Sequence, residues 1–193
     1  DLLTPFAAHA LVDSISAEQV AAEAREIRDA ALFLLSLSIL VLATTRHGWM
    51  VILHKADRQA LRTPLHVGLV GLLILVGASL LVMGLLTGDP LFLGFAVLEL
   101  VVGAGMLRYL FRAEIGPKAW WIEHLGALIG SGIGAYTAFF VFGGSRLLTQ
   151  IVSGPFEGLS LVLWFGPGVI GGVATVILSQ LLGLLRTRLL FSV

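Results

Sequence analysis

One acidic residue interrupts an otherwise apolar stretch, because Glu99 lies near the middle of residues 91–110. An ionised carboxylate at the centre of a membrane helix costs at least about 2.5 kcal/mol, so we expect Glu99 to face protein and to find a partner. Two interpretations remain open: a proton-relay or ion-coupling carboxylate, and a protonated acid hydrogen-bonded between helices. We favour the second, because a transport pathway usually carries several polar residues and broken helices. The candidate partners at similar depth are Ser36, Ser38, Ser79, Ser131, Tyr136 and Thr137.

Histidine is the second residue type that could carry chemistry. Four of the five histidines fall on the side of the predicted bundle that holds most of the basic residues: His47, His54, His66 and His124. A b-type haem needs two imidazoles from different helices, and His66 and His124 each open a predicted helix at comparable depth. The alternative is that such a histidine meets lipid headgroups or a neighbouring carboxylate such as Glu123. No His-x-x-x-His spacing occurs, so no metal site is predicted.

Small residues recur every four positions in the fourth apolar stretch, at Gly126, Gly130, Gly134 and Ala138. Such a stripe lets another helix approach closely, and in lipid this packing must supply the association. The next apolar stretch offers a matching surface at Gly168 and Gly172, beside a proline that should kink it. We therefore expect these two helices to pack together; the alternative is a stripe that accommodates a flat porphyrin, quinone or pigment ring.

The composition excludes several classes of activity. There are no cysteines, which removes disulfides, thiolate metal sites, cysteine nucleophiles and covalent c-type haem. Twelve basic and twelve acidic residues balance, so no excess charge indicates a nucleic-acid partner. No nucleophile motif or phosphate-binding loop is present. We expect a protein that is not an enzyme and that needs no cofactor, apart from the haem, pigment or quinone alternatives above.

The elements that must position these residues are membrane helices. Of 193 residues, 58% are hydrophobic and 12% charged, whereas a soluble domain has roughly a quarter charged. A span needs about 20 apolar residues, and five stretches qualify: 30–53, 65–86, 91–110, 122–142 and 159–182. Thr63-Pro64 reads as a helix start, and Gly88-Asp89-Pro90 as a tight turn. The predicted fold is an all-α integral membrane bundle of about five transmembrane helices.

Basic residues orient this bundle, because they are retained on the cytoplasmic side. Nine of them fall on one side of a five-helix arrangement: Arg46, Lys55, Arg58, Arg62, Arg108, Arg112, Lys118, Arg186 and Arg188. The other side holds Arg25, Arg28 and Arg146. The N-terminus is therefore predicted outside and the C-terminus in the cytoplasm. An aromatic belt on the inner face agrees with this orientation, formed by Trp49, Trp120 and Trp121.

Residues 1–29 form a separate extracytoplasmic segment in this prediction, and residues 30–193 form the transmembrane domain. Ser16 to Gln19 resembles a capping box, followed by apolar residues at helical spacing among charged ones. This predicts an amphipathic helix running into the first span. It is either a docking surface for a partner or an ordinary solvated helix lying on the membrane, which we favour. No signal-like apolar run occurs in this segment, so we expect it to belong to the mature structure.

From Trp120 onward the chain resembles a group of uncharacterised bacterial multi-pass membrane proteins of unknown function. The matching residues are Trp120 with His124, then Thr137-Ala138-Phe139, then Trp164, Pro167, Ile170 and Gly171. The Gly48-Trp49 stretch is similar to the loop before their second helix. The resemblance implies a bacterial inner-membrane protein and brings no activity with it. The charged N-terminal helix departs from the pattern.

Three hypotheses follow. The leading one is a non-enzymatic accessory or structural subunit of a larger bacterial membrane complex, respiratory or photosynthetic, with lipid and other membrane subunits as its partners. The second is an electron carrier with b-type haem bound by His66 and His124. The third is a small proton-coupled transporter built around Glu99.

Overall fold

A computed structural model describes residues 17–114, 116, 118–144, 161–174 and 177. The chain divides into two compact units, residues 1–38 and residues 39–193. In the first unit the described residues form the beginning of helix α2 (Ala17–Leu53), which carries Glu18 in its first turn. The predicted amphipathic helix and the predicted first span thus belong to one uninterrupted helix of 37 residues.

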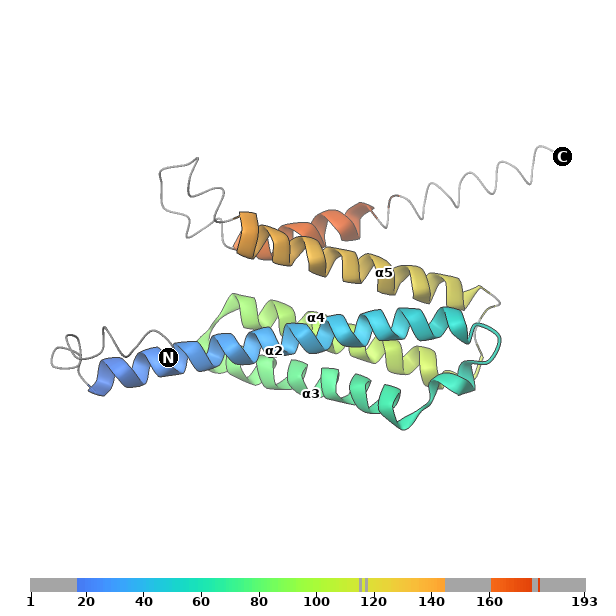
Figure 1. Cartoon of the computed structure of the whole chain (residues 1–193), viewed down its shortest axis with the longest axis horizontal. Coiled ribbons are helices and arrows are strands. Elements are labelled where there is room, and N and C mark those ends of the chain that lie inside the picture. The colour runs from blue at the N-terminus through green and yellow to red at the C-terminus, as the bar shows by residue number, and fades with distance from the viewer. Residues whose placement is uncertain (1–16, 115, 117, 145–160, 175–176, 178–193) are drawn as a thin grey trace, which may run out of the picture. The chain divides into compact units, whose positions relative to one another are not determined.

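The second unit contains the end of α2 and all later helices (Figure 1). They are η1 (Arg58–Leu61), α3 (Pro64–Thr87), α4 (Pro90–Phe111), α5 (Ala119–Ala138), the π-helical turn η2 (Phe139–Gly144) and the apolar helix Leu161–Ala174. Every regular element in the described ranges is helical, so the predicted all-α bundle is confirmed. Of the predicted fifth span, residues 159–160, 175–176 and 178–182 lie outside the described residues.

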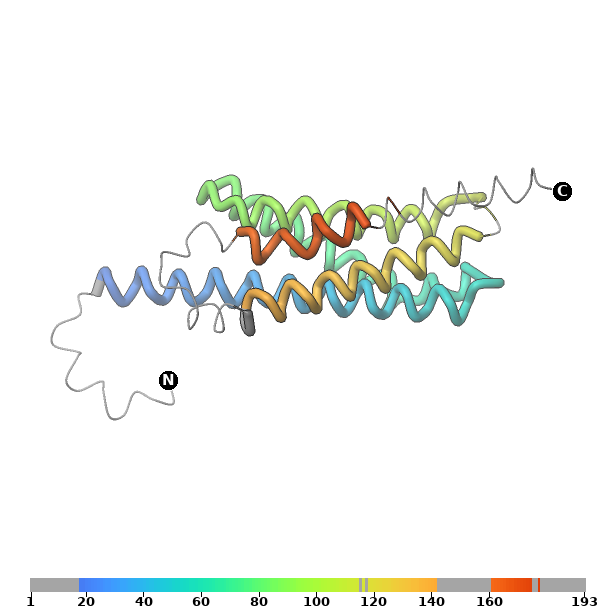
Figure 2. Tube along the Cα trace, turned by 90° about the horizontal axis from the view of Figure 1, so that it is seen from above, coloured from blue at the N-terminus to red at the C-terminus, as the bar shows by residue number. Residues whose placement is uncertain are grey.

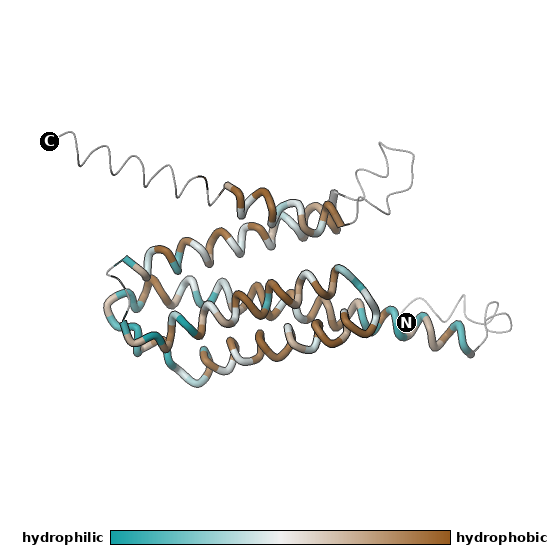
Figure 3. The backbone as a smooth tube through the Cα atoms, turned by 180° about the vertical axis from the view of Figure 1, so that it is seen from behind, coloured by the Kyte–Doolittle hydropathy of each residue, from teal (hydrophilic) through white to brown (hydrophobic). Residues whose placement is uncertain are grey.

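Among the described residues, four helices are long and apolar enough to cross a membrane: α2, α3, α4 and α5 with its continuation to Val141. Their middle portions are hydrophobic, while the connections from α2 to α3 and from α4 to α5 are more hydrophilic (Figure 3). By length and composition the chain is therefore a membrane protein.

The helix ends confirm two sequence predictions. The Thr63 side chain accepts a hydrogen bond from the His66 amide, and Pro64 occupies the first turn of α3. Gly88 ends α3 with a φ of 72°, a left-handed conformation that glycine adopts without penalty. Asp89 then accepts from the Leu91 amide and Pro90 begins α4. This local chemistry folds α3 and α4 into an antiparallel hairpin (Figure 2).

The α3–α4 contact depends on three glycines. A Cβ atom placed on Gly77 would lie 3.0 Å from Glu99 Cβ, one on Gly103 would lie 2.6 Å from Ile74 Cγ1, and one on Gly84 would lie 2.9 Å from Leu93 Cγ. In lipid the hydrophobic effect does not drive helices together, so van der Waals packing at such close approach has to stabilise their association. The glycines therefore set how near the two helices lie.

We predict that Gly84→Ala destabilises the hairpin. Its Cβ would also lie 3.0 Å from the Leu93 backbone nitrogen, which cannot move without shifting α4, and such overpacking costs about 1–3 kcal/mol. Gly71→Ala is the matched control on α3, because nothing lies within 4 Å of that position. There the higher helix propensity of alanine should be neutral or favourable. Thermal unfolding in detergent measures both variants, and equal stability of the two would contradict the packing assignment.

Candidate functional site

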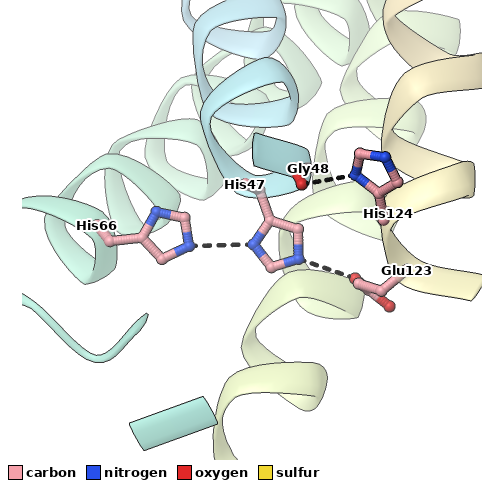
Figure 4. A network of polar contacts seen from close by, with 5 residues as sticks. All are labelled: His47, Gly48, His66, Glu123 and His124. Carbon is pink, nitrogen blue, oxygen red and sulfur yellow. Dashed lines mark hydrogen bonds and ion pairs between the residues drawn. The ribbon is translucent and has the colours of Figure 1, made fainter. Parts of the chain in front are cut away.

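A chain of hydrogen bonds joins three helices at one end of the second unit. His47 of α2 places its Nδ1 atom 3.0 Å from Nε2 of His66 in α3, and its Nε2 atom 3.0 Å from Oε1 of Glu123 in α5 (Figure 4). The two imidazole rings are nearly parallel, with ring centroids 5.2 Å apart. We call Glu123, His47 and His66 the histidine relay.

The relay runs from the surface of the molecule to its interior. The Glu123 side chain is 28% exposed, whereas that of His47 is 1% exposed and His66 is fully buried. Tyr109 of α4 packs edge-on against the His47 ring, with centroids 5.7 Å apart. His47 of α2 is therefore in contact with residues of α3, α4 and α5, and its ring is shielded from bulk water.

The protonation states of the relay follow from donor and acceptor rules. A carboxylate can only accept, so ionised Glu123 requires a proton on His47 Nε2. In neutral His47, Nδ1 then accepts from His66 Nε2, and His66 Nδ1 carries a lone pair. That Nδ1 atom is buried and has no hydrogen-bond partner among the described residues. The relay thus has one end near solvent and one open end in the interior.

A close approach of α2 and α5 positions the relay. A Cβ atom on Gly48 would lie 2.8 Å from Ala127 Cβ, so only glycine fits there. The Gly48 carbonyl accepts a 2.8 Å hydrogen bond from His124 Nδ1 (Figure 4). One turn beyond Ala127 on α5, Ser131 Oγ lies 3.3 Å from Thr45 Oγ1 of α2. These contacts fix α5 beside the end of α2.

The basic residues of the α2–α3 and α4–α5 connections close this end of the bundle. Arg62 Nε donates to the Leu110 carbonyl at 2.9 Å, and Arg58 Nη2 donates to the Ala113 carbonyl at 3.4 Å. Lys55 lies 5.4 Å from the ring centroid of Trp120. The two connections predicted to share one side of the membrane therefore meet in the structure. We call this side the basic end.

Glu99 is a further buried ionisable group, away from the relay. It is fully buried in α4 and lies against Gly77 of α3. Three hydroxyl groups considered as its partners donate to carbonyls of their own helices: Ser38 to Leu34, Ser79 to Leu75 and Ser131 to Ala127. A fourth, Ser36, donates to the Phe33 carbonyl.

The glycines of the stripe on α5 are not the residues through which α5 contacts the helix Leu161–Ala174. A Cβ atom placed on Gly126, Gly130 or Gly172 would meet no described residue within 4 Å, and one on Gly134 would lie 3.6 Å from Val41 of α2. Ala138 is exposed. The helix Leu161–Ala174 does contact α5, but through Ile133, whose side chain would lie 3.8 Å from a Cβ on Gly168 and 2.6 Å from one on Gly171.

The pair nominated for haem is separated by a third histidine. His66 and His124 lie on opposite sides of His47 (Figure 4), and the Nε2 atom of His66 is already bonded to His47. A haem between them would have to displace His47. Among the described residues, no group of three or more histidine, aspartate or glutamate side chains could hold a metal ion.

Sequence reasoning grouped His47 with the other histidines but missed its role. The available signal was that Arg46-His47-Gly48 interrupts the first apolar stretch. Successive spans cross the membrane in opposite directions, so the end of the first span and the start of the fourth lie at the same depth. Glu123, the carboxylate proposed above as a histidine partner, lies at that start. What the structure adds is the connection: His47 is bonded to both His66 and Glu123, and Gly48 allows the close approach of α5.

Comparisons of this chain with protein families, with curated proteins and with solved structures find no match. The fold and the site together define a class: a multi-helix membrane protein in which two buried histidines are hydrogen-bonded to a partly exposed carboxylate at the basic end.

We predict that Gly48→Ala loosens the site and that Ala127→Gly rescues it. The added methyl group would force α5 away from α2 and lengthen the His124–Gly48 and His47–Glu123 contacts, at about 1–3 kcal/mol. In the double variant the space is restored, so its unfolding free energy should exceed that of Gly48→Ala alone. A double-mutant cycle by thermal unfolding in detergent measures the coupling. Strictly additive effects would show that these two residues do not determine the approach of the helices.

Proposed function

We propose that this chain is a non-enzymatic protein of the bacterial inner membrane, with its basic end in the cytoplasm, and that it passes protons through the histidine relay. The observation that carries the proposal is the succession of two 3.0 Å hydrogen bonds from partly exposed Glu123 to buried His66. Ionisable groups inside a membrane bundle are costly and tend to be functional.

The relay can move one proton without any residue leaving its place. With Glu123 ionised, both histidines carry their proton on Nε2. When a proton arrives at His66 Nδ1, the Nε2 proton of His66 moves to His47 Nδ1, and the Nε2 proton of His47 moves to Glu123. The result is a neutral carboxyl group and two histidines protonated on Nδ1. Before a second proton follows in the same direction, Glu123 releases its proton to water and both histidines return to the Nε2-protonated form by ring rotation. The reverse sequence takes a proton from Glu123 and delivers it at His66 Nδ1.

The surroundings of the relay support this exchange. Because His47 is 1% exposed, bulk water does not compete for its two nitrogens. Its hydrogen bonds keep donors and acceptors close enough for transfer. The orientation rests on the basic end, which the positive-inside rule assigns to the cytoplasm. Glu123 is then the cytoplasmic terminus of the relay.

The test is proton flux in vesicles of phosphatidylcholine and phosphatidylglycerol that contain a pH-sensitive dye, with a potassium ionophore to cancel membrane potential. Wild-type protein should dissipate an imposed pH gradient about tenfold faster than empty vesicles, a barrier lower by about 1.4 kcal/mol. Glu123→Gln preserves an acceptor oxygen but cannot bind the proton, and His47→Gln interrupts the relay, so both should return the rate to background. His54→Gln is the matched control, because that histidine lies outside the relay. Wild-type flux at background, or unchanged flux in both relay variants, would refute the proposal.

A second candidate function is that of an accessory subunit in a larger membrane complex, favoured by the outer face of α5. Only 6% of its most apolar window is buried, against 28% in α3 and 33% in α4, counting the described residues. No described residue lies within 4 Å of a Cβ atom placed on Gly126 or Gly130 of that face, and small residues are what membrane helices use to pack closely. A helix of another membrane subunit is the occupant that this surface fits.

For this candidate we expect Gly130→Leu to abolish association with a partner subunit in mild detergent while leaving the fold intact. Ala135→Leu is the control, because Ala135 is also exposed but points about 140° away around the helix. Chemical crosslinking before extraction, followed by electrophoresis, reports the complex. A complex that persists in Gly130→Leu, or that is lost equally in Ala135→Leu, would exclude this face as the contact.

A further inference from the structure

Two buried polar sites lie in line along one face of the α3–α4 hairpin. On α3 the buried residues follow one another at helical spacing from the relay inward: His66, Val70, Leu73 and Gly77. Gly77 contacts Glu99 of α4, and the buried face of α4 returns towards the basic end through Gly103, Met106 and Tyr109. Tyr109 packs against His47 of the relay. The same surface therefore connects Glu99 to both ends of the His47–His66 pair.

The spacing between the sites is set by helix geometry. His66 and Gly77 are eleven residues apart on α3, and Glu99 and Tyr109 are ten apart on α4. At 1.5 Å per residue the two paths measure about 15–17 Å. A proton cannot cross this distance in one step between fixed side chains, so water or a change of packing has to bridge it.

An apolar layer fills the space between the sites. Its buried members are Ala43, Val70, Leu73 and Met106, none more than 4% exposed, with partly buried aliphatic side chains packed around them. On α3 and α4 the buried residues of this layer are aliphatic or methionine side chains, Val70, Leu73 and Met106. An apolar constriction of this kind blocks ions by excluding water and opens when it becomes wet.

We propose that Glu99 is a second proton-binding group on the path of the histidine relay, and that Leu73 and Met106 form the gate between them. This inference rests on the proposed function and adds the path by which protons pass between the interior of the membrane, at Glu99, and the relay. When the layer admits a chain of water molecules, the Glu99 carboxyl group releases its proton to that chain, and His66 Nδ1 accepts one from it. Glu99 is left ionised until it takes up a proton from the opposite side of the membrane, and the relay delivers one proton to Glu123.

The placement of Glu99 explains why the gate is needed. Its carboxyl group is fully buried near the middle of α4, where a permanent aqueous path would short-circuit the membrane. A closed apolar layer keeps Glu99 and the relay on separate sides of a barrier. The lone pair of His66 Nδ1, unpartnered in the described part of the chain, is the acceptor at the near side of that barrier.

The experiment weakens the gate and then removes the inner acid. Leu73→Ser should raise proton flux about tenfold over wild type, because a hydroxyl group stabilises water in the layer and lowers the barrier by about 1.4 kcal/mol. Met106→Ser tests the same layer from α4 if Leu73→Ser does not fold. Leu75→Ser is the matched control on α3, since Leu75 is 63% exposed and lies outside the layer. Adding Glu99→Gln to Leu73→Ser should return the flux to background.

The outcomes separate this inference from the relay itself. Flux that is lost in Glu123→Gln but unchanged in both Glu99→Gln and Leu73→Ser would overturn the gate while leaving the relay intact. Raised flux in Leu73→Ser that persists in the Glu99→Gln double variant, or that Leu75→Ser reproduces, would be a non-specific leak and would also overturn it. Wild-type flux at background would refute the proposed function and, with it, this inference, so the two failures give different results.

Discussion

The constraint on which this structure depends is that a hydrogen-bonding group away from water must find its partner inside the protein. For the backbone, the hydrogen bonds within each helix satisfy this requirement. The hydroxyl groups of Ser38, Thr44, Ser79, Thr87 and Ser131 meet it by donating to carbonyls of the preceding turn. Each of these hydroxyl protons is thus used within its own helix, although Ser131 Oγ also lies 3.3 Å from Thr45 Oγ1 of α2. Histidine and glutamate cannot be satisfied in this way, because their polar atoms extend beyond the reach of their own helix.

The same constraint separates two kinds of helix contact. The α3–α4 hairpin is held by glycines that bring the backbones together, at Gly77, Gly84 and Gly103, around an apolar core. The contact between α2 and α5 combines one close approach, at Gly48, with polar contacts from Thr45, His47 and the Gly48 carbonyl. The polar contacts of α5 are therefore concentrated towards the basic end, and its outer face contributes little to the core.

The sequence predicted the parts of the fold that local chemistry determines. Apolar length located α3 and α4, and Thr63, Pro64, Gly88 and Asp89 predicted where these helices begin or end, because capping involves only neighbouring residues. Which glycines pack could not be predicted, since that depends on how each helix is rotated. The regular stripe at Gly126 and Gly130 was the more conspicuous pattern, yet the irregularly spaced Gly84 and Gly103 make the tight contacts.

The candidate site was predictable in its ingredients but not in its connections. Depth placed His66, His124 and Glu123 together, and pairing two helix-opening histidines was the simplest arrangement. Depth does not show which side chains point inward, and His47 occupies the space between them. A histidine in the last turns of a helix, followed by glycine, was the signal that the neighbouring helix approaches there.

A purely structural role for the relay is the main alternative to proton passage, because buried polar networks can also fix how helices pair. Such networks stabilise and rigidify a protein when every polar atom is satisfied, and an unsatisfied atom makes them costly. The relay does join three helices, as a structural network would. Its innermost atom, His66 Nδ1, nevertheless lacks a partner among the residues that the structure describes. A network selected only for packing would end in a satisfied group or an apolar one, whereas a proton path must end in an atom that can still accept.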